Sequence, residues 1–147
     1  MIWEEDFKTG KKAEHEFAAL LLMKWVISWW REPKWKFSYW DMELETPKWD
    51  ITVEVKNDNL RPSTGCIWIE YECKWVPSWI AISKADYYVY KLGNDFWMAQ
   101  RSKLINLLLA STTKKDCQWG DDWTAKLWVI PESEFYSIAK KVWTEWK

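Results

Sequence analysis

The chain has 147 residues, of which 48% are hydrophobic and 29% are charged, a balance that predicts a globular domain and excludes a disordered one. Its net charge of −1 gives no bulk attraction to nucleic acid, so a nucleic-acid partner needs a locally basic surface. The three cysteines form no CxxC pair, and their odd number excludes a closed set of intrachain disulfides. Reduced thiols in a cytoplasmic protein are therefore expected.

The sequence predicts neither a signal peptide nor a membrane-spanning segment. The opening residues MIWEEDFKTG carry acids where a signal peptide needs a basic and then an apolar stretch. The longest apolar run is short and is interrupted by Lys24, so no membrane association is expected.

A helix is expected first, over residues 11–30, with Thr9 as its N-cap and Pro33 beyond its end. Its predicted core stripe is formed by Phe17, Leu20, Leu21 and Ile27. Two strands follow within residues 37–56, around a turn at 46–49.

The next predicted elements are a strand at 66–72, a hairpin within 85–100 around Gly93-Asn94, a short helix at 102–111 and a strand at 125–130. A terminal amphipathic helix is marked by Phe135, Ile138, Val142 and Trp146. The order helix, three strands, hairpin, helix, strand, helix predicts one mixed α/β domain over residues 1–147.

The apolar alternation of the first two strands fixes their predicted register. Met42 and Leu44 alternate on one strand as Ile51 and Val53 do on the next, so pairing about the turn places Asp41 opposite Glu54. Opposite residues have Cβ atoms about 4.5–5.5 Å apart, a separation at which two carboxylates can hold one divalent cation. Lys56 lies one step beyond Glu54 on the same face.

A solvated polar face is the alternative interpretation, since antiparallel hairpins commonly show one polar face to water. Against it stands the charge pattern: the acids of this face have only Lys56 as compensation, and like charges opposite one another destabilise a sheet. A bound cation would turn that repulsion into coordination. The acids are Asp41, Glu43, Glu45, Asp50 and Glu54.

The arrangement Asp41 … Glu54-Val55-Lys56 resembles the PD-(D/E)xK nuclease superfamily. The Gly10-x-x-x-Glu14 spacing in the first helix is similar to the setting of a further acid in that family. The segment GCIWIEYECKWVPSWIAISKADYYVY looks like phage-encoded members, so the resemblance covers roughly residues 10–130. It implies a restriction-endonuclease-like core, in which a helix precedes a mixed sheet flanked by helices.

The resemblance also implies Mg²⁺- or Mn²⁺-dependent hydrolysis of phosphodiester bonds. Asp41, Glu54 and the Val55 carbonyl would hold the cation, and Lys56 would assist the attacking water. Glu14 would support the site or bind a second metal, although a solvated acid in the first turn of a helix is the plain alternative.

Further residues are weaker candidates. Glu16 and Glu70 could support the metal, each with a surface acid as its alternative. Positive side chains near these elements could contact a phosphate backbone or be ordinary solubilising charges. They are Lys11, Lys12, Arg61, Lys74 and Lys84.

Other enzyme classes find little support. His15 is the only histidine, and no nucleophile elbow, P-loop or GxGxxG motif is present. The chain is expected to be a nuclease that acts on DNA. Two alternatives stay open, namely that RNA is the substrate and that the chain forms a homodimer. The rival hypothesis is a non-catalytic, Trp-rich module that binds nucleic acid or protein, with its acidic hairpin merely solvated.

Overall fold

The computed structural model describes residues 2–23, 27–33, 40–57, 65–73, 76–77, 79–81, 83–111, 115–119 and 125–142. The main sheet has six strands in the order β1-β2-β3-β6-β7-β10. They are β1 (Trp29–Arg31), β2 (Met42–Glu45), β3 (Asp50–Asn57), β6 (Tyr87–Leu92), β7 (Asp95–Gln100) and β10 (Lys140–Lys141). β3 and β6 are parallel and the other neighbours are antiparallel, so the sheet is mixed.

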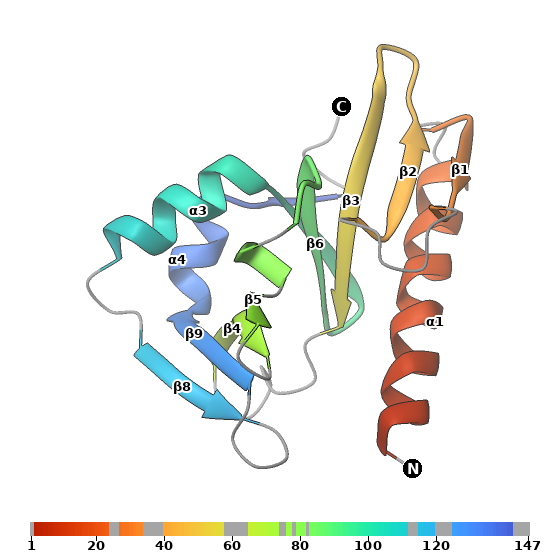
Figure 1. Ribbon diagram of the computed structural model, residues 1–147. Coiled ribbons are helices and arrows are strands. Elements are labelled where there is room, and N and C mark those ends of the chain that lie inside the picture. The colour runs from red at the N-terminus through yellow and green to blue at the C-terminus, as the bar shows by residue number, and fades with distance from the viewer. Residues whose placement is uncertain are drawn as a thin grey trace.

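Helix α1 (Ile2–Met23) covers one face of this sheet, alongside β1, β2 and β3 (Figure 1). Phe17 and Leu21 of the helix are fully buried against Met42 and Val53 of the strands, which forms the first hydrophobic core. Within the described residues, no helix has the length and apolar character needed to cross a bilayer.

A second sheet and two further helices lie on the other side of the main sheet (Figure 1). This sheet has the order β5-β4-β9-β8, with β4 (Cys66–Cys73), β5 (Val76–Pro77), β8 (Lys115–Trp119) and β9 (Ala125–Pro131). The helices are α3 (Arg101–Ala110) and α4 (Glu132–Tyr136), and a 3-10 turn, η1, spans Trp79–Ala81. They enclose a second core that includes Ile69, Leu104 and Phe135.

Strand β6 separates the two cores. Val89 belongs to the first core, whereas Tyr88 and Tyr90 belong to the second, and all three are at most 1% exposed. A strand buried on both faces is a continuous apolar run, which explains the sequence Tyr87-Tyr88-Val89-Tyr90.

The first helix differs from its prediction at both ends. It begins at Ile2, so Thr9 lies inside the helix and is not its N-cap. It ends at Met23, and the aromatic pair Trp29-Trp30 forms an edge strand, because pairing with β2 overrides the helical continuation of the pattern. Ile27 is buried in the first core, although it lies outside the helix.

The predicted terminal helix is wrong beyond Tyr136. Phe135 is buried in the second core and Val142 in the first, a division that one helix stripe does not allow. The chain instead leaves α4 and pairs Lys140 and Lys141 with β7. Trp146 lies outside the described residues. The mixed α/β class, both hairpins, the helix after the second hairpin and the strand near 125–130 are confirmed.

Candidate functional site

The β2–β3 hairpin has the register that its apolar alternation predicts. Met42 pairs with Val53, Leu44 with Ile51 and Glu45 with Asp50, on either side of the turn at 46–49. Asp41 stands just before β2, and its amide donates to the Val53 carbonyl at 3.0 Å. Asp41 is thereby held at the level of Glu54 on the neighbouring strand.

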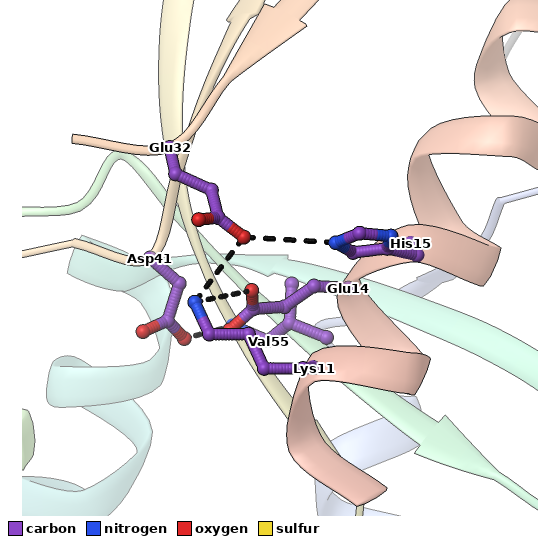
Figure 2. Close-up of polar contacts among 6 residues, drawn as sticks. All are labelled: Lys11, Glu14, His15, Glu32, Asp41 and Val55. Atoms are coloured by element: carbon purple, nitrogen blue, oxygen red, sulfur yellow. Dashed lines mark hydrogen bonds and ion pairs between the residues drawn. The ribbon is translucent and has the colours of Figure 1, made fainter. Parts of the chain in front are cut away.

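Two hydrogen bonds orient the Asp41 carboxyl. Its Oδ2 accepts from the backbone N–H of Val55 at 2.9 Å, a contact drawn in Figure 2. It also shares a hydrogen bond with the Glu54 carboxyl. The structure therefore brings together the two acids that the register pairs, and leaves Asp50 at the hairpin tip.

Glu54 is the most perturbed acid of this group. It is only 7% exposed, because the second core covers its face of the sheet beside Tyr88. Burial and the nearby Asp41 carboxylate raise the pKa of Glu54 to about 9, and attraction to Lys56 offsets only part of the rise. At neutral pH, and without a cation beside it, this raised pKa keeps a proton on Glu54.

Glu14 lies on helix α1, on the side that faces Asp41 (Figure 2). It is also 7% exposed. Burial and then the charge of Asp41 raise the pKa of Glu14 to about 7, while Lys11 lowers it in part. Three carboxyl groups from the helix, the start of β2 and β3 thus influence one another electrostatically.

Lys56 lies two residues after Glu54 on the same face of β3 and is exposed. Its charge stabilises the ionised form of Glu54. Because Lys56 is exposed and Asp41 is half-buried, solvent reaches the edge of the group. The catalytic role of Lys56 stays a prediction.

Glu32 is a residue that the sequence interpretation missed. Its Oε1 lies 3.2 Å from Lys11 Nζ and 3.7 Å from His15 Nε2 (Figure 2). The sequence signal that could have found it is the strand character of Trp29–Arg31. The predicted helix extends to residue 30, which places Glu32 in the segment that ends this helix. With β1 placed beside β2, Glu32 instead reaches toward α1.

One part of the charge argument needs correction. Lys56 is not the sole compensation on the hairpin, because Arg31 of β1 forms an ion pair with Glu43. That contact, followed by a hydrogen bond from the Trp40 indole, lowers the pKa of Glu43. Glu43 is thus a paired structural acid.

The two weaker supporting acids lie elsewhere. Glu16 accepts a 2.6 Å hydrogen bond from Lys91, on a different side of α1 from Glu14. Glu70 belongs to β4, which pairs with β9 and not with β3. Since Ile69 packs into the second core and successive strand residues alternate, Glu70 faces away from that core.

The basic residues proposed to contact a phosphate backbone differ in their exposure and pairing. Lys12 and Lys84 are exposed, whereas Lys11 forms ion pairs with Glu14 and Glu32. Burial lowers the pKa of Lys11, but these two carboxylates outweigh burial and the net pKa is raised. Arg61 and Lys74 lie outside the described residues.

The donor set suits a hard cation held partly by water. In the described part of the chain, no three His, Cys, Asp or Glu side chains are arranged to hold a metal ion by themselves. Mg²⁺ typically takes one or two carboxylates and keeps several waters, so a contacting Asp–Glu pair is sufficient protein ligation. Asp41 and Glu54 are therefore the residues that fit this ion.

Comparisons with known proteins add no relative. No protein-family model, curated protein or solved structure matches this chain. Its functional interpretation therefore depends on its own residues.

Proposed function

We propose that this chain is a metal-dependent nuclease of PD-(D/E)xK type that hydrolyses phosphodiester bonds of DNA. The observation that carries the proposal is the contact between the carboxyls of Asp41 and Glu54 on adjacent strands, in a largely buried setting. Burying a carboxyl beside another carboxyl is unfavourable unless a proton or a cation compensates the charge.

A divalent cation is the better compensation near neutral pH. A proton neutralises only one of the two groups, whereas Mg²⁺ or Mn²⁺ neutralises both and is bound by the oxygen atoms they present. Such paired, perturbed acids are more frequent at functional sites than in structural cores.

Each residue has a distinct task in this proposal. Asp41 and Glu54, with the Val55 carbonyl, hold Mg²⁺ or Mn²⁺, and Val55 N–H fixes the Asp41 carboxylate. When bound, the ion polarises the phosphoryl oxygen and orients a water. Lys56 directs that water and offsets negative charge that develops at the phosphorus. Glu14 adds negative potential from the helix side.

The architecture supports the same family. A helix precedes a mixed sheet, α1 covers one face of it, and α3 and α4 lie on the other side (Figure 1). This arrangement is compatible with a restriction-endonuclease-like core, to which the second sheet would be an addition.

The test is cleavage of end-labelled single-stranded, duplex and branched DNA, and of RNA, with Mg²⁺, Mn²⁺ or a chelator. We expect cleavage of DNA only with a divalent cation, and none by Glu54→Gln. Cation-independent binding without cleavage would instead support the Trp-rich module, for which Trp29 and Trp49 are more than 60% exposed.

A further inference from the structure

The ammonium group of Lys11 occupies a position between carboxylates of two different elements. Its Nζ lies 3.4 Å from Oε2 of Glu14 on α1 and 3.2 Å from Oε1 of Glu32 beyond β1 (Figure 2). The Glu14 side chain is 9% exposed. The helix side of the acidic group thus already holds one cation, supplied by the chain itself.

A third group that can bind metals contacts the Glu32 end of this ion-pair cluster. His15 Nε2 lies 3.7 Å from the same Glu32 oxygen that contacts Lys11. Among the described residues, the buried Oε2 of Glu14 has no hydrogen-bond donor in ordinary geometry, so the loose ion pair with Lys11 is its compensation. Carboxylates and an imidazole are groups that Mn²⁺ and similar divalent ions accept as ligands, although these three side chains are not arranged to hold an ion together while Lys11 lies between the carboxylates.

Lys11 and a divalent ion exclude each other at this position. Metal–oxygen bonds are about 2.0–2.2 Å, so the two carboxylates would have to move closer than the ammonium allows. The positive charge of Lys11 also repels a second cation directly.

We propose that Lys11 is a built-in counter-ion that fills a second cation position between Glu14 and Glu32. It thereby limits the chain to one divalent ion, at Asp41 and Glu54. The inference rests on the proposed function for the identity of that first ion. Removal of Lys11 opens the second position to Mn²⁺.

The experiment counts Mn²⁺ ions bound per chain by calorimetric titration and by electron paramagnetic resonance of free Mn²⁺. Wild type should bind one ion and Lys11→Met two. The matched control is Lys12→Met, because Lys12 is the next residue on the helix, is 76% exposed and pairs with Glu16 instead. This control should bind one ion.

Two further variants locate the effect. Lys11→Arg keeps the charge and should bind one ion, and the double variant Lys11→Met/Glu32→Gln should return from two ions to one. Circular dichroism checks folding, and Lys11→Gln replaces Lys11→Met if the latter does not fold.

The outcomes separate this inference from the proposed nuclease. Two ions in wild type, one ion in both wild type and Lys11→Met, or two in Lys12→Met would overturn it. No ion in wild type but one in Lys11→Met would support the counter-ion and refute the Asp41–Glu54 metal site. No ion in either protein would refute both.

Discussion

Asp41 and Val55 join the start of one strand to the middle of the next, because the Asp41 carboxylate accepts the Val55 N–H at 2.9 Å. This bond turns the Asp41 side chain across the hairpin toward Glu54. A carboxylate fixed in this way meets its partner at no further cost in side-chain entropy when a cation binds.

Asp41 and Asp50 form a matched pair of variants. Asp50 follows the hairpin turn and is four residues from Glu54 on the same strand, about 13 Å at the strand rise. We expect Asp41→Asn to lose cleavage by roughly 100-fold or more, and Asp50→Asn to stay within about twofold of wild type. Single-turnover rates with Mg²⁺ measure both, and the reverse result would refute the site.

Lys56→Ala should lower the cleavage rate by about 10²–10³-fold, because it removes the charge that stabilises the transition state. DNA binding should change little. Lys103→Ala is the control, since Lys103 is exposed on α3, outside the site. Equal rates for wild type and Lys56→Ala would remove Lys56 from catalysis.

Glu14 and Glu16 lie on the same helix but have different neighbours. Glu14→Gln should weaken Mn²⁺ binding and cleavage about tenfold, because it removes negative potential beside Asp41. Glu16→Gln should leave both nearly unchanged, since Glu16 pairs with Lys91. Titration calorimetry and cleavage rates give the comparison, and equal effects would show that Glu14 has no special role.

The raised pKa of Glu54 predicts that the stability of the protein depends on pH when no divalent cation is added. Its pKa rises from 4.5 unfolded to about 9 folded, so the folded state binds more protons between these values. The stabilising contribution of Glu54 to the free energy of unfolding should therefore be complete below about pH 4.5. It should be lost progressively as the pH rises toward 9.

Urea midpoints at pH 5, 7 and 9 measure this trend. Glu54→Gln should flatten the profile between pH 7 and 9, because its amide does not titrate and the other raised pKa, that of Glu14, is about 7. Added Mn²⁺ should raise the midpoint most at high pH, where binding displaces fewer protons. A wild-type profile as flat as that of the variant would argue against the buried setting of Glu54.

Leu104 and Leu109 are two leucines of helix α3 that differ in burial, so their alanine variants test how α3 packs on the second core. Leu104 is fully buried and Leu109 is 72% exposed. Leu104→Ala should lower the free energy of unfolding by about 2–5 kcal/mol, and Leu109→Ala by less than about 0.5 kcal/mol. Urea denaturation compares them, and similar losses would contradict the placement of α3.

The sequence by itself determined the β2–β3 hairpin and its register. Met42 and Leu44 alternate against Ile51 and Val53, and a shift by one residue would expose all of them, so a local pattern suffices. The same alternation identified the pair Asp41 and Glu54 before any long-range contact was known.

Only the tertiary structure decided which elements pair with each strand and cover its two faces. The pattern of β4 does not say which strand it pairs with, and the structure places Glu70 in a second sheet, where β4 pairs with β9 and not with β3. The end of α1 likewise depended on pairing of β1 with β2, which brought Glu32 to Lys11.

The burial of Glu54 has the same origin. A strand pattern marks its side chain as polar and outward, but β6 pairs beside it and the second core packs over that face. Period-two alternation specifies which side chains share a face, whereas the burial of that face depends on contacts between segments far apart in the chain.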